Sequence, residues 1–311
     1  MEVIEVDSRY YSQVFSKPSH VFNSAAFNAV NEYKCEQVYY LLFKDSKVRL
    51  GIVFGLRDQK LYSPFSAPFG GFEALYEDVK IQQIDEALEA LHQWATTKKI
   101  EGIKIVPPPF FYNANFLNKS YNALIRSGFA TTTIELNYQF PTVKFDEQYQ
   151  TTIWYNAKKN LKKALQFGLT FEKIENKNGE QAYKIIQQNR SERGFPLRMT
   201  WEQVSETMSV VPVDIFLVKK EQENIAAAFV FHVTDSVVQV VYWGDLPQFS
   251  ECKTMNFISY EVFNYYKQLG KKMVDIGIST VDSIPNHGLC EFKESIGCDM
   301  AIKTDFYKML S

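Results

Sequence analysis

Hydrophobic and polar residues alternate in two similar groups of short segments along the 311-residue chain. Residues 37–65 contain three runs rich in Val, Leu, Tyr and Phe, and residues 213–243 repeat the same pattern. The polar turns between the runs lie at 45–47 and 57–59 in the first group and at 221–224 and 234–236 in the second. Short apolar runs separated by polar turns are typical of strands. Each group therefore predicts a three-stranded meander.

An amphipathic helix is expected after each meander. Apolar residues recur every three or four positions in residues 81–98 and 254–269, which is the spacing of one helix face. Gly270 follows the second of these helices and suits its C-terminal end. An apolar strand is expected directly afterwards in both halves, at 102–106 and 272–276. This order of strand, helix and strand implies a parallel crossover.

Both halves then close with the same two elements. A short helix that ends in a glycine is expected over residues 123–129 and 292–298, and a final strand at Thr131–Tyr138 and Met300–Met309. The helical segments that precede the two meanders lie at about 8–33 and about 179–208. Every element of one half therefore has a partner in the other.

The repeated order predicts an α/β (α+β) fold with two tandem domains, each a mixed sheet flanked by helices. We place the domains at residues 1–145 and 146–311, with a linker at 139–150, because Pro141 and mixed polarity interrupt the periodicity there. A chain of this length suits two cores of roughly 150 residues each. Hydrophobic residues make up 46% of the chain and charged residues 23%, so both domains have ample apolar surface to bury.

The net charge is −2 at pH 7, and no run of Lys and Arg is long enough to act as a nucleic-acid tail. Nonspecific binding to duplexes is therefore not expected. A local basic groove remains open, because four lysines gather on one short segment. They are Lys158, Lys159, Lys162 and Lys163.

The segment Met1–Asp7 is acidic and lacks the basic start and apolar stretch of a secretory signal. No apolar window reaches the roughly 18 residues that span a bilayer. These features predict a cytoplasmic protein without a membrane span. The cysteines lack C-x-x-C spacing, which favours free thiols and no metal site. They are Cys35, Cys252, Cys290 and Cys298.

Two local motifs resemble the Fem-type (FemABX) aminoacyltransferases and their bacterial acetyltransferase relatives. Residues 157–169, AKKNLKKALQFGL, are similar to the basic segment "RR-x-x-x-KA-x-x-G-hydrophobic" that opens the second domain of these enzymes. Residues 288–297, GLCEFKESIG, look like their signature "G-L-x-x-F-K-x-x-x-G". Meander, helix, strand, helix and strand is also the element order of the GNAT fold, so the resemblance covers nearly the whole chain.

The resemblance implies acyl transfer to an amine or hydroxyl. Fem-type enzymes move an amino acid from aminoacyl-tRNA onto an amine of a peptidoglycan precursor, and relatives are presumed to use acyl-CoA. We therefore expect an N-acyltransferase that uses either acyl-CoA (acetyl-CoA) as co-substrate or aminoacyl-tRNA as donor, with tRNA a partner only in that role. The acceptor is a small molecule or a cell-wall precursor, and the sequence leaves the number of subunits open.

Two other functions stay open. A non-catalytic GNAT-like module that binds a nucleotide sugar or a peptide is favoured by the degenerate donor loops of both halves. A structural partner in a surface-polysaccharide pathway would show neither ligand binding nor turnover.

Phe292 and Lys293 are the first catalytic candidates. In the family the lysine of this motif lies beside the phenylalanine ring, and its charge can stabilise the oxyanion of the transfer step. The substitution Lys293→Ala is therefore expected to lose transfer and keep its fold. A core aromatic and a solvated lysine would give the same residues without catalysis. His287 directly precedes the signature and is a candidate for proton transfer or substrate contact.

Lysines of the basic segment are candidates for binding a phosphate of tRNA, a nucleotide sugar or CoA, because clustered ammonium groups attract polyanions. The candidates are Lys158, Lys159 and Lys162. An exposed helix face is the alternative explanation.

Arg193 and Arg198, with Arg190, surround a loop between two helices in the region where GNAT folds form the acceptor wall. Arginine suits a bidentate contact with a carboxylate or phosphate. An ordinary surface loop would explain the same residues. Asp275, at the end of a strand, could orient an amine or act as a cap.

Neither half keeps the "[QR]-x-x-G-x-[GA]" loop of the usual acetyl-CoA site, whose backbone N–H groups meet the pyrophosphate at a helix N-terminus. Gly70 and Gly71 could admit close approach of a ligand to the backbone and line the acceptor cleft. Lys253 and Thr254 lie at the start of the second amphipathic helix and could help it to bind an anion.

The two halves differ in their chemistry. Only the second half has the basic segment 157–169 and the Phe-Lys signature. In the corresponding helix of the first half, we expect Ile125-Arg126 at the position of Phe292-Lys293. We therefore expect catalysis in residues 146–311 and acceptor-side support from a degenerate first domain, 1–145.

Overall fold

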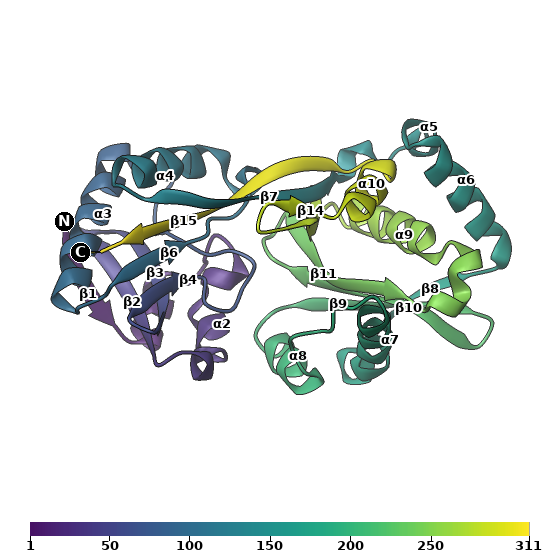
Figure 1. Cartoon of the computed structure of the whole chain (residues 1–311), viewed down its shortest axis with the longest axis horizontal. Coiled ribbons are helices and arrows are strands. Elements are labelled where there is room, and N and C mark those ends of the chain that lie inside the picture. Colours follow the sequence, from purple (N-terminus) through teal and green to yellow (C-terminus); the bar gives the residue numbers. More distant parts are fainter. Residues whose placement is uncertain (311) are drawn as a thin grey trace. The chain divides into compact units, whose positions relative to one another are not determined.

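The computed structural model describes residues 1–310 (Figure 1). It divides into two compact units: Met1–Leu136 together with the segment from Ala301 on, and Asn137–Met300. These bounds differ from the expected domains, because the chain passes from one unit to the other inside a strand on two occasions. The final strand of the first half contributes its end to the sheet of the second unit, and the final strand of the second half contributes its end to the sheet of the first.

The first unit contains a mixed sheet with strand order β1-β2-β3-β4-β6-β15, and β5 pairs with β3. Its strands are β1 (Glu2–Val6), β2 (Gln37–Lys44), β3 (Val48–Arg57), β4 (Lys60–Ser63), β5 (Glu73–Ala74), β6 (Gly102–Ile105), the start of β7 (Ala130–Pro141) and the end of β15 (Asp299–Met309). Its helices are α1 (Ser8–Val14), α2 (Ala25–Ala29), α3 (Ile81–Thr97) and α4 (Ala114–Arg126), with short 3-10 turns at η1 (Val21–Asn23), η2 (Glu32–Lys34) and η3 (Phe110–Tyr112).

Strand β2 is buried on both faces. Leu41 and Phe43 belong to one apolar core, which also contains residues of α3 and α4. Tyr40 and Leu42 belong to a second core with Tyr11 of α1. Successive side chains of a strand point to opposite faces of a sheet, so this run is continuously apolar because both faces are covered.

The second unit contains a sheet with strand order β7-β12-β11-β10-β9-β8. Its strands are β8 (Thr170–Ile174), β9 (Val213–Lys220), β10 (Glu223–His232), β11 (Val237–Asp245) and β12 (Met273–Ile278), and β13 (Thr280–Val281) with β14 (Ile284–Pro285) forms a separate hairpin. Its helices are α5 (Tyr149–Thr152), α6 (Tyr155–Ala164), α7 (Gly179–Glu192), α8 (Trp201–Met208), α9 (Thr254–Gln268) and α10 (His287–Ser295). Short 3-10 turns lie at η4 (Thr142–Lys144), η5 (Leu165–Phe167), η6 (Asn176–Asn178) and η7 (Pro247–Cys252).

The predicted duplication is confirmed. The antiparallel meander β2-β3-β4 corresponds to β9-β10-β11. The crossover helices α3 and α9 each lead into a strand that pairs in parallel with the last meander strand. Gly270, predicted to end α9, follows it with a φ of 70°, the left-handed conformation that glycine adopts without steric cost.

The expected linker at 139–150 is wrong for its first three residues. Gln139, Phe140 and Pro141 belong to β7 and pair with Asp275, Val274 and Met273 of β12. The Phe140 ring stacks on Phe263 of α9 with 3.9 Å between centroids. Pro141 suggested a break, but a proline at the last residue of a strand removes little of the hydrogen-bond ladder.

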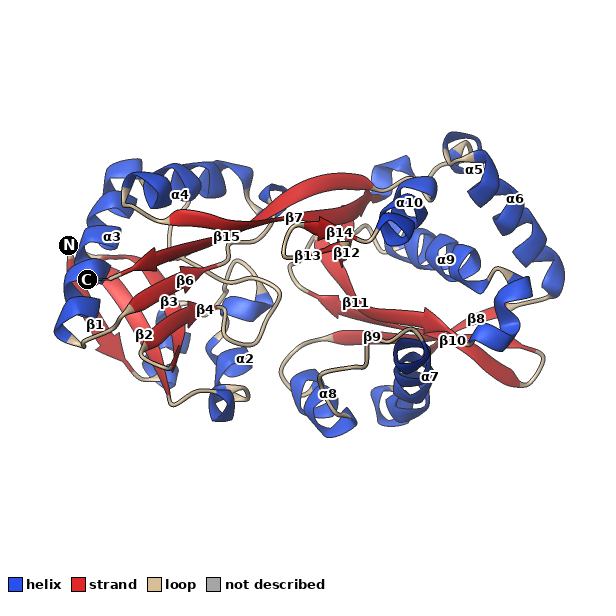
Figure 2. Cartoon of the chain, in the orientation of Figure 1, coloured by secondary structure: helices blue, strands red, loops and turns tan. Residues whose placement is uncertain are grey.

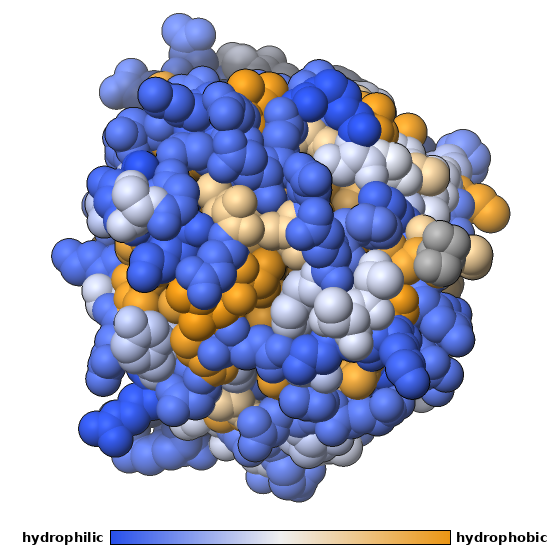
Figure 3. All heavy atoms as spheres, turned by 90° about the vertical axis from the view of Figure 1, so that its left-hand side faces the viewer, coloured by the Kyte–Doolittle hydropathy of each residue, from blue (hydrophilic) through white to orange (hydrophobic). Residues whose placement is uncertain are grey.

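None of the helices formed by residues 1–310 has the length and apolar content needed to cross a bilayer. Figure 3 shows mainly hydrophilic residues on the face that it turns to the viewer, with a group of hydrophobic residues among them. The four cysteines are free. Within the described part of the chain, no cluster of three or more His, Cys, Asp or Glu side chains could hold a metal ion.

Candidate functional site

Strands β11 and β12 of the second unit pair only over their first residues. The ladder joins Val237, Val238 and Gln239 to Met273, Val274 and Asp275. Beyond this point β11 continues to Asp245 and β12 to Ile278, and the two strands diverge (Figure 2). In the first unit, the corresponding strands β4 and β6 stay paired up to Ser63 and Ile105, their last residues. The carboxyl ends of neighbouring parallel strands are where α/β folds bind ligands, so this divergence makes the second unit the candidate site.

Lys293 of α10 lies at the diverging end of β12. Its side chain is 2% exposed. The ammonium nitrogen Nζ donates to the backbone carbonyls of Ile276, Gly277 and Ile278 at 2.8, 2.8 and 3.0 Å. These bonds use the three N–H donors of a lysine. Lys293 thus holds the end of β12 at Gly277, whose φ of 70° is rare for any other residue.

The structure changes two expectations for Lys293. A solvated lysine is wrong, because the side chain is buried. The substitution Lys293→Ala is not expected to keep this region intact, because three carbonyl groups would lose a buried donor, at about 1–3 kcal/mol for each unsatisfied group. The catalytic role of Lys293 stays a prediction, and with its donors on the backbone it would act by positioning the end of β12.

Burial lowers the pKa of Lys293 to about 8, although the nearby carboxylate of Asp275 acts in the opposite direction. An unfolded lysine has a pKa near 10.5. Between these two values the unfolded chain binds more protons than the folded chain, so the free energy of unfolding gains a contribution that rises with pH. Below pH 8 both states are protonated and the contribution is constant.

We expect the free energy of unfolding in urea, measured between pH 7 and 10.5, to depend on pH differently in the unaltered protein and in Lys293→Met. The stability of the unaltered protein relative to the variant should rise from about pH 8 onward, because the variant has no ammonium to bury. Two parallel pH profiles would contradict the lowered pKa of Lys293.

Asp275 is fully buried beside this clamp and connects three strands. Its Oδ1 accepts hydrogen bonds from Asn137 Nδ2 of β7 and from the backbone N–H of Gly277, and its Oδ2 accepts one from Gln239 Nε2 of β11, each at 2.8 Å. The carboxylate thus lies at the last paired position of β11 and β12. This geometry fits the capping explanation for Asp275.

Aromatic side chains surround Lys293 and Phe292. The Lys293 Nζ lies 5.3 Å from the centroid of the Tyr138 ring, and the Tyr138 hydroxyl donates to Glu294 Oε1 at 2.9 Å. Burial raises the pKa of Tyr138 above its ordinary value. Phe292 is half-buried and meets Trp243 of β11 edge to face, with 6.3 Å between centroids. Sequence reasoning missed Tyr138 and Trp243, since each lies in an apolar strand that predicts only core.

The end of β11 contacts one of the candidate arginines. Asn189 Nδ2 of α7 donates to the Asp245 carbonyl at 2.7 Å, and Arg193 Nη2 lies 3.6 Å from Asp245 Oδ1. Burial raises the pKa of Asp245 and lowers the pKa of Arg190. Arg198 is exposed in the loop that follows α7. The structure therefore brings Arg193, but not Arg198, to the carboxyl end of β11.

The candidate lysines lie on the exposed face of α6. Ala157, Leu161 and Ala164 form its buried face, and α6 packs on α9 and α10. The exposed lysines are Lys158, Lys159, Lys162 and Lys163. The structure agrees with a solvated helix face, and phosphate binding by these lysines stays a prediction.

The remaining second-half candidates lie at the N-termini of α9 and α10. Lys253 is half-buried with a φ of 56° and Thr254, the first residue of α9, is fully buried. The Thr254 hydroxyl has no hydrogen-bond partner among residues 1–310. His287 is exposed at the first residue of α10. Anion binding at α9 and proton transfer by His287 stay predictions.

Gly70 lines a cavity of about 500 Å³ in the first unit, and Gly71 adjoins it in sequence with a φ of 94°. The backbone N–H of Gly70 donates to the Val106 carbonyl at 2.8 Å, and the Val106 N–H donates to the Ser63 carbonyl at 2.8 Å. These bonds hold the glycine segment against the closed ends of β4 and β6. The two glycines thus lie beside a cavity of the first unit, and their contact with an acceptor stays a prediction.

The comparison of Ile125-Arg126 with Phe292-Lys293 is wrong by two positions. Gly128 and Gly297 follow the two helices with φ of 84° and 88° and are therefore equivalent. Lys293 precedes Gly297 by four residues, and the residue at the same distance before Gly128 is Leu124. Leu124 is part of the apolar core, whereas Arg126 is exposed and pairs with Asp85 at 2.6 Å. Of the two corresponding helices, α4 and α10, only α10 of the second unit therefore has a buried lysine at this position.

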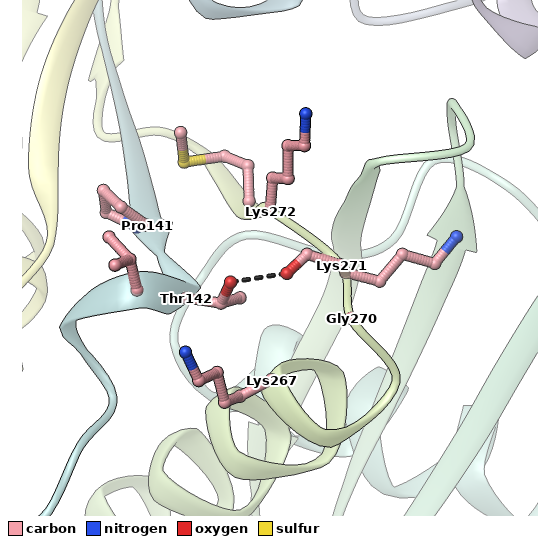
Figure 4. A pocket seen from close by; sticks show the side chains of 8 residues that line it. Pro141, Thr142, Lys267, Gly270, Lys271 and Lys272 are labelled. Atoms are coloured by element: carbon pink, nitrogen blue, oxygen red, sulfur yellow. Dashed lines mark hydrogen bonds between the residues drawn. The ribbon is translucent and has the colours of Figure 1, made fainter.

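A second cavity, of about 440 Å³, contains none of the predicted site residues (Figure 4). It lies between the end of α9 and the start of β12, and the Thr142 hydroxyl donates to the Lys271 carbonyl at 2.5 Å beside it. Lys267 and Lys272 complete its basic side. The chemistry of the candidate site lies at the other end of β12.

No protein-family model and no curated protein matches this chain. Several solved structures are similar in fold. FemX is 13% identical with a TM-score of 0.73, and the match covers 100% of this chain and 98% of FemX. L-PGS from Bacillus licheniformis is 13% identical with a TM-score of 0.62, covering 98% and 92%. A tandem GNAT protein from the clavulanic acid biosynthesis pathway is 6% identical with a TM-score of 0.54, covering 100% and 98%. The chain therefore has the tandem GNAT fold, as FemX does.

Proposed function

We propose that this protein is an acyltransferase of the GNAT superfamily, which transfers an acyl or aminoacyl group to an amine or hydroxyl of a cell-wall or glycan-related acceptor. The observation that carries the proposal is the divergence of β11 and β12 beyond Gln239 and Asp275, with Lys293 holding the end of β12. The first unit has neither feature. Transfer is therefore assigned to the second unit, and the first unit supports the acceptor.

The proposed reaction is a direct attack by the acceptor. The acceptor nitrogen forms a bond to the carbonyl carbon of the donor, and the bond from that carbon to the sulfur of CoA or to the ribose oxygen of tRNA breaks. The proton that the amine gives up is taken up by the leaving sulfur or oxygen, which becomes a thiol or a hydroxyl. Such a step needs positioning and oxyanion stabilisation more than a covalent nucleophile. Backbone N–H groups of β11 beyond Gln239, which no longer pair with β12, would donate to the carbonyl oxygen.

Both proposed donors carry phosphate groups. The start of α9, with Lys253 and Thr254, offers backbone N–H groups and a positive dipole end to a phosphate. The exposed lysines of α6 add positive charge on a helix that packs on α9 and α10. Arg193, beside Asp245 at the carboxyl end of β11, would contact an anionic acceptor. The exposed Arg198 stays a candidate for acceptor binding and the exposed His287 for proton transfer.

We expect acetyl-CoA or CoA to raise the midpoint of thermal unfolding, because a ligand that binds only the native state at about 100 times its Kd adds about 2.7 kcal/mol. The substitution Lys253→Glu should reduce this shift, and Lys308→Glu in the first unit should leave it unchanged. The panel includes UDP-linked cell-wall precursors. A shift with CoA would favour acetyl-CoA as the donor. A shift with these precursors alone would fit both aminoacyl-tRNA as the donor and the non-catalytic module, which the presence or absence of turnover separates.

The non-catalytic module remains the second candidate function. It is favoured by the cavity of the first unit and by the absence of a glycine in the Gln248–Thr254 segment before α9. Ligand binding without any turnover would decide for it.

A further inference from the structure

The cavity of about 500 Å³ in the first unit has a polar end that nothing in the transfer reaction uses. Its lining includes His20, Glu73 and Ser19 from segments far apart in the sequence. A volume of this size is in the range of small-molecule pockets, which combine apolar walls with a few placed polar groups.

His20 lines this cavity and has a buried polar atom without a partner in the described part of the chain. The residue is 3% exposed, and its ring nitrogen Nδ1 is buried without a hydrogen-bond partner among residues 1–310. Burial lowers the pKa of His20 to about 3, so the imidazole is neutral at working pH and one of its nitrogens is an acceptor. A buried polar atom without a partner is costly. Nδ1 has almost no accessible surface, so the ring forms part of the cavity wall without offering this nitrogen to a ligand.

Glu73 places a carboxyl group beside His20. It is 2% exposed, and its Oε1 accepts from the Ser19 N–H at 2.7 Å. Its Oε2 accepts from the Ser19 hydroxyl at 2.7 Å and from Asn23 Nδ2 at 3.0 Å. Burial raises the pKa of Glu73 despite these bonds. A cation in the cavity would offset that cost, because an opposite charge nearby favours the ionised form.

Aromatic rings form much of the remaining wall. Phe72, Tyr112 and Phe116 line the cavity, and rings of this kind attract organic cations through their faces. Two lysines also line it, but Lys17 is exposed to solvent and the ammonium of Lys119 donates to the Val79 carbonyl at 2.8 Å. The buried charged group of the cavity is therefore a carboxylate.

We propose that this cavity binds a small ligand that carries an ammonium group, with Glu73 as its counter-ion, the neutral ring of His20 beside it and the aromatic rings around its apolar part. The binding needs no acyl donor and lies within the first unit. It can therefore be tested whether or not the second unit transfers acyl groups.

The test uses benzylamine and benzyl alcohol, which share a shape and differ in charge at neutral pH. Binding to the full chain is measured by calorimetry and by the 15N shift of the His20 ring in histidine-labelled protein. We expect benzylamine to bind about tenfold more tightly than the alcohol and to shift the His20 signal. The advantage of the amine should fall to about twofold or less in Glu73→Gln, and it should persist in Glu89→Gln, which removes an exposed carboxylate of α3.

Equal affinity of the two compounds for the unaltered protein would overturn the proposal without reference to any variant. An amine that binds but leaves the His20 signal unmoved, or one that binds a folded Glu73→Gln as tightly as before, would also overturn it, since the amine would then lie elsewhere.

Discussion

The substitution Lys293→Met is expected to lower the rate of acyl transfer by about 100-fold or more. The ammonium of Lys293 fixes three consecutive carbonyls, those of Ile276, Gly277 and Ile278, at the end of β12. Methionine fills a similar volume without donating a hydrogen bond, so the strand end loses its anchor. A displacement of about 1 Å at a reacting centre can cost about 100-fold in rate.

The measurement is a steady-state assay with a saturating donor, and far-UV circular dichroism confirms that the variant is folded. Lys308→Met is the matched control, because the Lys308 ammonium also donates to a backbone carbonyl, that of Ser127, but in the first unit. We expect the control to keep its turnover. A folded Lys293→Met with unchanged turnover would remove Lys293 from the mechanism.

The substitution Asp275→Ala is expected to destabilise the second unit by about 4 kcal/mol. The Asp275 carboxylate accepts hydrogen bonds from Asn137, Gln239 and the Gly277 N–H in a site closed to solvent. Alanine leaves the Gln239 and Gly277 donors without this partner, at about 1–3 kcal/mol each. It also removes the shorter of the two bonds of Asn137 Nδ2, which keeps the longer one, to the Tyr138 carbonyl at 3.4 Å. It also removes the negative charge that favours the ammonium of Lys293.

Tryptophan fluorescence can follow this loss in urea. Three tryptophans, Trp154, Trp201 and Trp243, lie in the second unit and only Trp94 lies in the first. The substitution Asp275→Asn keeps an acceptor oxygen and should cost about 1 kcal/mol. Equal stability of Asp275→Ala and the unaltered protein would show that the carboxylate does not hold the three strands together.

The sequence was sufficient to predict the meander, the crossover helix and the strand that follows it in both units, but not the strands β1, β5, β8, β13 and β14. The meanders follow from alternating short runs that end at polar turns, and α3 and α9 follow from the spacing of their apolar residues. The helix-ending glycines were predictable because a left-handed backbone strongly favours glycine. These signals are local, since each lies within a few turns of the chain.

The exchange of final strands between the units was not predictable in this way. Phe140 pairs with Val274 and Phe306 pairs with Ile105, and both pairs join residues that are distant in sequence. The spacing of hydrophobic residues along the chain does not indicate which strand pairs with which. The role of Lys293 was hidden for a related reason. A lysine in a helical motif indicates a charge, but its burial and its three carbonyl acceptors depend on the path of β12.

Polar residues inside apolar strands were the remaining signal. Asn137, Gln239 and Asp275 interrupt strands whose neighbouring side chains are buried. Buried polar groups are nearly always hydrogen-bonded, but Asn137 belongs to the first half of the sequence and the other two to the second, so their shared network follows only once β7 is known to pair with β12. In the first unit, His20 and Glu73 gave no comparable pattern. His20 lies in a loop and Glu73 in the two-residue strand β5, so their approach depends on the fold of the whole unit.

The most direct test of transfer by the second unit is a mass-spectrometric assay of the purified protein with isotope-labelled acetyl-CoA or aminoacyl-tRNA and a panel of amine-bearing cell-wall precursors. We expect labelled acyl or aminoacyl product with one of the two donors, and its loss in a folded Lys293→Met. No product with either donor across the panel, despite ligand binding, would contradict the assignment and leave the non-catalytic module.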